Sequence, residues 1–498
     1  MIPKRRFALR PAKMPQTWIL SMPSHKATVS QTSTFRILYA CWSTGLSFWS
    51  VSDWLLSVTS VSRDDSLSCT ADSTLKQLLG QSGAMAEQAG QQYYSQGLRQ
   101  KFLLDEKKTI SANPQQTYAD IKYEIDEAKY KERNAKVLAA GNLATTVPSG
   151  FPEKLGGPLI WSSSDFQDEN EYIIRLSKSD IEEITSALKH FKDLELEGDE
   201  VDEKSFPLPT LGPRLESASN DVYNGRGFTI VRGLDPESFS LEDYTIVYLG
   251  VSSYIAERRG KQDQRGSMLM HVMARDVTDE DPKNKDKPFH TDVVTDTLAL
   301  ITQQCSAEGG RSVIASAWTI YNELAATRPD ILHTLAASDW PFDTYGRKPA
   351  YYSRAILYYY HEKAIMSFSR RLLVGHDPRE PRTPGIPGLT EIQAEALGAL
   401  HFIAEKHAIR PTMEKGDMRF INNMAILHRR EAFVNSADSE RHLIRVWLNN
   451  PEKCWDLPDP LKLAWARVFD DDERDVNWDI RPLRNADGRV IRAGGSCD

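Results

Sequence analysis

Short apolar runs bounded by glycine or by polar residues recur between residues 150 and 450. Gly227–Gly233 is one such run, Thr297–Gln304 is a second, and Met424–Leu427 is a third. Runs of this length and composition are typical of buried strands. Arg441–Leu448 is rich in β-branched and aromatic residues and is predicted to be a further strand.

Fewer segments show the 3.6-residue period of an amphipathic helix. Ser179 and Glu182 have the spacing of a capping box, and Thr390 and Gln393 repeat that spacing in front of a second helix. The predicted helices lie near residues 120–140, 179–191, 318–326 and 390–403. The apolar faces of the second and fourth of these helices consist of Ile181, Ile184, Leu188 and Phe191, and of Ile392, Leu397, Leu400 and Ile403. Short strands with few long helices, and no internal repeat, favour a mixed β fold: a double-stranded β-helix (jelly-roll) core covered by α-helices.

Residues 1–84 differ in composition from the rest of the chain. The first acidic residue is Asp53, whereas lysine, arginine, serine and threonine are frequent before it. Such a start is typical of a mitochondrial transit peptide. We favour a non-native or disordered extension, with synthesis from Met85, because ordinary composition begins there. An apolar run of about 18 residues does not occur, so the sequence predicts no membrane span.

The rest of the chain divides into three further segments. Residues 85–149 are charged and are predicted to form a partly helical N-terminal arm, in which Glu127 and Lys131 have the spacing of an ion pair. Residues 150–455 contain the regular structure and form the predicted jelly-roll domain. Residues 456–498 are predicted to be a peripheral C-terminal extension.

The charge of the chain limits its partners. The 498 residues have a net charge of −8, which argues against a nucleic-acid binder, since those proteins are normally basic. The five cysteines show no paired spacing, and this is typical of reduced thiols in an intracellular protein. We therefore expect a cytoplasmic protein, or a mitochondrial one if residues 1–84 are a genuine transit segment.

Two distant segments contain the strongest candidate chemistry. His290 and Asp292 flank Thr291, and in a strand both side chains would point to the same side. His428 ends the third apolar run. Two histidines and one carboxylate can hold one face of an octahedral Fe(II) and leave three positions open. Arg441 and Arg445 follow at an even spacing, and buried arginines of this kind pair with carboxylates.

These segments resemble the fungal branch of the TauD/TfdA-like (taurine catabolism dioxygenase) family of Fe(II)/2-oxoglutarate-dependent oxygenases. The resemblance includes Gly309-Gly310-Arg311-Ser312, Tyr321–Ala325, Gly416-Asp417 and Arg441–Leu448, and covers roughly residues 150–470.

The resemblance implies an oxidoreductase with Fe(II), 2-oxoglutarate as co-substrate and O2. It implies that His290, Asp292 and His428 are the metal ligands and that residues 150–455 are the dioxygenase domain. It assigns Arg441 and Ser312 to the distal carboxylate of 2-oxoglutarate, and Arg445 to the prime substrate. The implied reaction oxidises, most simply hydroxylates, a small molecule and releases succinate and CO2.

One alternative is a catalytically silent jelly-roll protein that binds a metal or ligand, and another is an enzyme acting on a macromolecule. Arg258 and Arg259 lie in a segment that either closes over the site or carries ordinary surface charges. The sequence specifies neither the prime substrate nor the oligomeric state.

Overall fold

The computed structural model describes residues 117–273, 285–292, 295–376, 380–470, 473–484, 486 and 490. The predictions for residues 1–84, and for the arm up to residue 116, lie outside this part.

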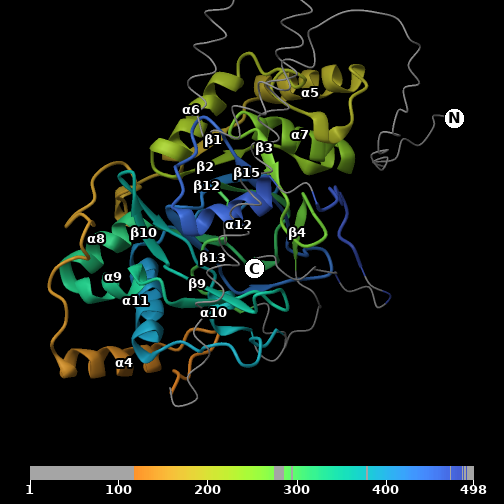
Figure 1. Cartoon of the computed structure of the whole chain (residues 1–498). Helices are drawn as coiled ribbons and strands as arrows, with labels where there is room; N and C mark the ends of the chain where they lie inside the picture. Colours follow the sequence, from red (N-terminus) through yellow and green to blue (C-terminus); the bar gives the residue numbers. More distant parts are fainter. Residues whose placement is uncertain are drawn as a thin grey trace, which may run out of the picture. The chain divides into compact units, whose positions relative to one another are not determined.

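Figure 1 shows the arrangement of the helices and strands. The α-helices are α4 (Glu127–Ala140), α5 (Lys178–Asp193), α6 (Gly212–Asn224), α7 (Leu241–Ser253), α8 (Ala317–Thr327), α9 (Pro329–Ala336), α10 (Arg370–Val374), α11 (Glu391–His407) and α12 (Asp459–Phe469). The strands are β1 (Ile173–Arg175), β2 (Phe228–Arg232), β3 (Arg258–Gly260), β4 (Met270–Met273), β5 (Thr297–Gln304), β6 (Glu308–Gly309), β7 (Ser312–Ser316), β8 (Trp340–Asp343), β9 (Tyr351–Arg354), β10 (Leu357–Tyr360), β11 (Lys363–Met366), β12 (Met418–Asn422), β13 (Ile426–Arg430), β14 (Phe433–Val434) and β15 (His442–Asn449).

The largest sheet has seven strands in the order β1-β2-β12-β5-β15-β3, with β4 also paired to β15. Only β1 and β2 run parallel among these pairs. The predicted strands at Gly227–Gly233 and Thr297–Gln304 are confirmed as β2 and β5. The fold is therefore a mixed helix and sheet structure whose main sheet is mostly antiparallel.

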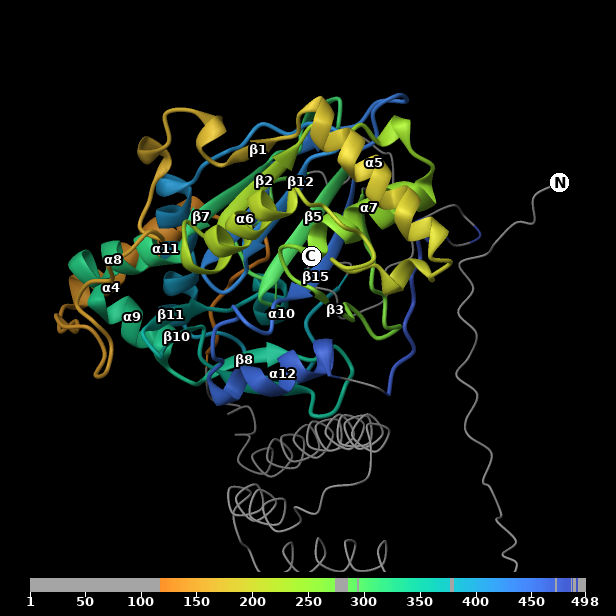
Figure 2. The ribbon, with the colours of Figure 1, turned by 90° about the horizontal axis from the view of Figure 1, so that it is seen from above.

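Three helices cover one face of this sheet, as Figure 2 shows for α5, α6 and α7. Side chains of these helices pack against residues such as Ile301 and Val446 of the sheet in one hydrophobic cluster. The capping box of α5 was predicted two residues too late, because Ser177 and Asp180 form it. Since serine also occupies position 179, the sequence offers two adjacent caps, and the structure uses the first.

A second, smaller antiparallel pair lies across the core from the main sheet. It consists of β7 and β13, with His428 opposite Ile314. One hydrophobic cluster contains residues of both sheets, such as Ile426 and Leu298, together with apolar residues of α8, α9 and α11. The predicted cap of α11 by Thr390 and Gln393 is confirmed.

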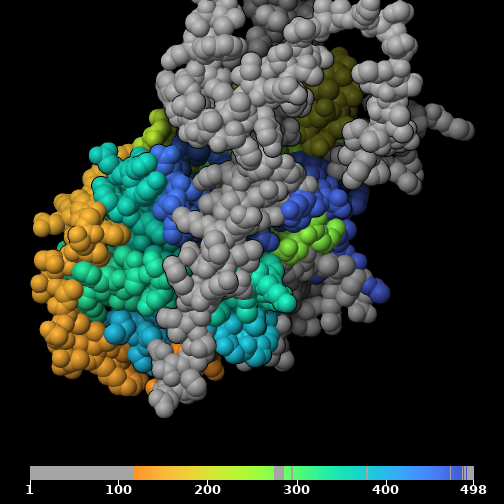
Figure 3. Space-filling model, in the orientation of Figure 1, coloured from red at the N-terminus to blue at the C-terminus, as the bar shows by residue number. Residues whose placement is uncertain are grey.

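The predicted arm helix begins later than expected, at the start of α4. The predicted Glu127–Lys131 ion pair is confirmed at 2.7 Å. The helix rests on α11, where the rings of Tyr130 and Phe402 stack with centroids 4.8 Å apart. Figure 3 shows this segment in orange at the surface, beside the blue residues of α11. An ion pair between Arg133 and Glu391, 2.7 Å long, adds to this contact between α4 and α11.

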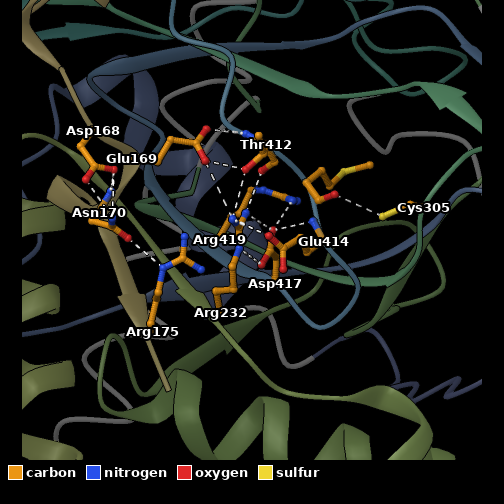
Figure 4. Close-up of polar contacts among 11 residues, drawn as sticks. Asp168, Glu169, Asn170, Arg175, Arg232, Cys305, Thr412, Glu414, Asp417 and Arg419 are labelled. Carbon is orange, nitrogen blue, oxygen red and sulfur yellow. Dashed lines mark hydrogen bonds and ion pairs between the residues drawn. The ribbon is translucent and has the colours of Figure 1, made fainter. Parts of the chain in front are cut away.

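The Gly416-Asp417 pair belongs to a buried ion-pair network at one end of the main sheet (Figure 4). Arg232 of β2 donates to both oxygens of Asp417 at 2.8 Å. Arg419 of β12 contacts Asp417 at 3.2 Å and Thr302 of β5 at 3.1 Å. Gly416 has a φ of 82°, and a Cβ there would collide with the carbonyl of Leu234. Asp417 therefore connects strands β2, β12 and β5 of the main sheet.

The C-terminal segment contributes to the core. Leu461 of α12 is fully buried, and Val468 accepts a backbone hydrogen bond from Lys261 at 2.9 Å. Arg258 of β3 donates to the carbonyl of Phe469 at 3.0 Å and pairs with Asp470 at 2.7 Å. Arg258 therefore anchors α12. Every helix in the described part of the chain is too short or too polar to cross a bilayer.

Candidate metal centre

His290 and Asp292 do not lie in a regular strand, contrary to the sequence prediction. His290 forms a single antiparallel bridge with His428, through backbone hydrogen bonds of 3.1 and 2.9 Å. The side chains nevertheless converge, because this bridge places the segment beside β13. The backbone pairing of His290 with His428 brings the donors together. The alternation of side chains along a single strand could not predict this pairing.

The structure brings together the three predicted metal ligands. One donor atom from each of His290, Asp292 and His428 lies within 4.8 Å of the others. His428 Nε2 is 3.7 Å from Asp292 Oδ1. Neighbouring donors about 2.1 Å from an octahedral first-row ion stand roughly 3 Å apart. A small inward movement would thus suffice to hold a divalent ion.

His290 is buried and oriented by its own backbone. Its Nδ1 lies 2.9 Å from the carbonyl oxygen of Pro288, which directs Nε2 toward the cluster. Burial, together with the neighbouring His428, lowers the pKa of His290 to about 3. His290 is therefore a neutral imidazole at physiological pH, and this is the form that binds metals.

Asp292 has no solvent exposure, and its two oxygens have different surroundings. Burial alone would raise its pKa, but the positive charge of Arg445 and the contact with His428 lower it below the usual value. Oδ2 lies 2.5 Å from Nε1 of Trp447 and 3.1 Å from Nη1 of Arg445. Oδ1 is buried and has no hydrogen-bond partner among the described residues. An ionised carboxylate with one unsatisfied oxygen fits a metal ligand.

Asn423 holds the backbone of the Asp292 segment. Its Oδ1 accepts from the amide of Asp292 at 2.8 Å. Its Nδ2 donates to the carbonyls of Asp292 and Thr295, at 2.8 and 3.1 Å. The sequence analysis assigned no role to Asn423, because the residues that it contacts are distant in the sequence.

The backbone amide of Asn423 continues this network to the C-terminal helix. It donates to the carbonyl of Asp296 at 2.8 Å. The Asp296 carboxylate accepts from Nδ2 of Asn449 and, at 3.0 Å, from Nε1 of Trp465 on α12. Burial raises the pKa of Asp296 to about 6. Helix α12 is thereby connected to the segment that carries Asp292.

Trp465→Phe is expected to destabilise the protein by about 1–3 kcal/mol, because it leaves a buried acceptor on Asp296 without its donor. Because the folded-state pKa of Asp296 is raised to about 6, the free energy of unfolding falls as the pH rises toward 6. Loss of the Trp465 donor raises this pKa further, and so makes the fall larger. The deficit should therefore be larger at pH 8 than at pH 5 in urea unfolding. Trp478→Phe is the control, because the indole of Trp478 has no acceptor in the described part of the chain. Equal losses in the two variants would contradict the prediction.

Ser312 begins β7 and lies opposite Arg430 of β13. Residues paired in this way point to the same face. Ser312, two residues from Ile314, therefore shares its face with His428 and is 9% exposed. The side chain of Ser312 therefore lies on the same side of the small sheet as that of His428.

Arg441 lies just before β15, with 3% exposure. Its Nε donates to the carbonyl of Gly310 at 2.9 Å, which joins it to the segment leading into Ser312. Gly310 has a φ of 73°, and a Cβ there would lie 2.8 Å from Cδ of Arg441. The positive φ and the close approach of Ser306 and Arg441 together favour glycine at this second position of the Gly-Gly motif.

Arg445 lies on the same face of β15 as Trp447 and contacts Asp292 of the donor cluster. Its Nη1 pairs with Asp292, and its Nε donates to Oε1 of Gln262 at 2.8 Å. Arg259, predicted as a possible closing-loop residue, donates instead to backbone carbonyls such as that of Val201. With Arg258 anchoring α12, neither arginine of that segment reaches the cluster.

A buried cluster of two histidines and one carboxylate, beside an antiparallel sheet and two buried arginines, defines the site class of mononuclear iron oxygenases. The family "Taurine catabolism dioxygenase TauD, TfdA family" matches residues 190–447. The chain belongs to this family. It is an Fe(II)/2-oxoglutarate-dependent dioxygenase that uses O2.

The chain matches two curated relatives over most of the length of each relative. The chain is 32% identical over 346 residues to the taurine hydroxylase-like protein SAT17 of Stachybotrys chartarum, covering 66% of this chain and 89% of the relative. It is 24% identical over 314 residues to FR-33289 synthase of Streptomyces rubellomurinus, covering 59% and 89%.

Among solved structures, the chain is similar to an asparagine oxygenase in complex with Fe(II), 3-hydroxyasparagine and succinate. The identity is 15% and the TM-score 0.44, with 56% of this chain and 93% of that chain covered. A second similar structure is the non-heme iron oxygenase OrfP in complex with iron, succinate and 3-hydroxyarginine. Its identity is 12% and its TM-score 0.40, with 56% and 94% covered.

Proposed function

We propose that this chain hydroxylates a small-molecule substrate, with His290, Asp292 and His428 as the iron ligands within a jelly-roll core. The convergence of the three donor atoms carries this proposal. The unsatisfied Oδ1 of Asp292 and the neutral imidazole of His290 fit a divalent cation. Iron bound there would activate O2 and couple decarboxylation of 2-oxoglutarate to oxidation of a C–H bond.

Arg441 and Ser312 would bind and orient the co-substrate. Arg441 would hold the distal carboxylate of 2-oxoglutarate in a charge-assisted contact, because its guanidinium is buried and positioned by Gly310. Ser312 faces the same space as His428 and would donate its hydroxyl to that carboxylate. Arg445 stays a candidate for the prime substrate. The surrounding apolar cluster excludes water, which strengthens each of these electrostatic contacts.

The decisive experiment measures succinate release by the purified chain with Fe(II), ascorbate, 2-oxoglutarate and O2. Screening starts with taurine and other small sulfonates, because the curated fungal relative is named taurine hydroxylase-like. It then extends to amino acids and to a metabolite extract. A product heavier by one oxygen atom supports hydroxylation. Absence of 2-oxoglutarate binding in anaerobic Fe(II) protein would contradict the proposal.

We also propose that residues 150–455 form the dioxygenase domain, with α12 packed against it and an arm at residues 85–149, in a cytoplasmic protein. Deletion of residues 1–84 is expected to leave folding and turnover intact, because that segment shows no periodicity of a packed element. The thermal unfolding midpoints of the truncated and full chains should agree within about 2 °C. A large fall in the truncated protein would show that the segment belongs to the fold.

A further inference from the structure

The two oxygens of Asp292 are placed in different environments by one strand. Trp447 and Arg445 lie on the same face of β15, two residues apart, and both contact Oδ2. The guanidinium of Arg445 lies 5.1 Å from the Trp447 ring centroid. Both side chains are 3% exposed, and Asp292 has no exposure. Two donors on one oxygen leave only Oδ1 directed toward His428.

Gln262 holds Arg445 in this arrangement. Its Oε1 accepts from Nε of Arg445 at 2.8 Å, and its Nε2 donates to the carbonyls of Met268 and Arg445 at 2.8 and 2.9 Å. Gln262 is 2% exposed. Since its amide is fixed at both ends, it restricts the rotation of the guanidinium. Asp292 is thus held by Arg445, and Arg445 is held by Gln262, which is itself bonded to the backbone of β15.

We propose that Trp447 and Arg445 are positioning residues that hold Asp292 as a one-oxygen metal ligand. This inference rests on the proposed iron site. The hydrogen bonds to Oδ2 prevent the carboxylate from rotating to offer both oxygens, and so preserve an open coordination position. Arg445 thereby acts on the metal ligand before any prime substrate binds, which differs from a purely substrate-binding role.

Trp447→Phe tests this, because it keeps an aromatic ring and removes the indole N–H that contacts Oδ2. The substitution also removes one ring of the indole, so the control must lose the same volume. Partners of metal ligands of this kind typically change metal affinity by about 10–100-fold when mutated. We expect a loss in that range when Co(II) is titrated into the apo protein, with a changed Co(II) visible spectrum. The matched control is Trp455→Phe, since the buried indole of Trp455 donates to the carbonyl of Tyr223 at 2.9 Å. That control should keep wild-type metal affinity.

The outcomes separate the two proposals. If wild-type protein binds Co(II) or Fe(II) and Trp447→Phe binds within twofold of it, the positioning inference is wrong and the proposed function stands. If wild-type protein binds neither ion, the proposed function fails and the inference fails with it. Arg445→Gln should also weaken metal binding without prime substrate. Unchanged Co(II) affinity in Arg445→Gln would remove Arg445 from the positioning role.

Discussion

Replacement of His290, Asp292 or His428 by alanine is expected to abolish iron binding and 2-oxoglutarate turnover. Each residue provides one of three donor atoms that lie within 4.8 Å of one another, and two remaining donors do not define the face of an octahedral site. Iron content after anaerobic loading and desalting measures binding, and succinate release measures turnover. Both should fall to background in all three variants.

Stability must be followed in parallel, because Asp292→Ala also removes the ion pair between Asp292 and buried Arg445. Breaking such a pair costs about 3–5 kcal/mol. His290→Ala and His428→Ala do not remove that pair, so their loss of iron reports on ligation alone. His401→Ala is the control, since His401 lies against Phe289 but outside the donor cluster. Normal iron loading and turnover by Asp292→Ala would disprove the triad.

Much of the main sheet could be predicted, because its strands have local signals. The run bracketed by glycines became β2, and the run after Asp296 became β5 with the predicted bounds. Helix α8 also ends before Arg328-Pro329, as the proline requires. Within α11, the predicted apolar face included Ile392, which is 54% exposed. Ile392 lies in the first turn of α11, where the helical period is a weak guide to whether a side chain is buried.

The sequence predicted which three donor residues come together, but not the contacts that hold them. The types and order of His290, Asp292 and His428 carry chemical information that the sequence displays. The partners of Asp292 do not, because Asn423 and Trp447 lie 131 and 155 residues away from it. Such contacts follow from strand order, which no local pattern specifies. The even spacing of Arg441 and Arg445 predicted a shared face, and only the structure shows that Arg445 contacts Asp292.

Arg441→Ala is expected to weaken 2-oxoglutarate binding by about 10–100-fold or more. Hydrogen bonds to charged groups contribute about 1.5–3 kcal/mol, and a bidentate contact lies at or above the top of that range. Each 1.4 kcal/mol corresponds to about tenfold in affinity. Arg441→Lys should restore only part of the loss, because lysine keeps the charge and lacks the planar fork.

Titration of 2-oxoglutarate into the anaerobic Fe(II) protein measures this effect through the charge-transfer absorption of the complex, without knowledge of the prime substrate. The control is Arg311→Ala, which lies in the same Gly-Gly-Arg-Ser motif but forms an exposed ion pair with Glu431 at 2.8 Å. Exposed pairs of this kind contribute little, so 2-oxoglutarate affinity should stay near wild type. Arg445→Gln should act mainly on the metal, and its 2-oxoglutarate affinity at saturating Fe(II) should fall less than that of Arg441→Ala. Equal losses in the two variants would contradict the division of roles, and an unchanged affinity in Arg441→Ala would remove Arg441 from the co-substrate site.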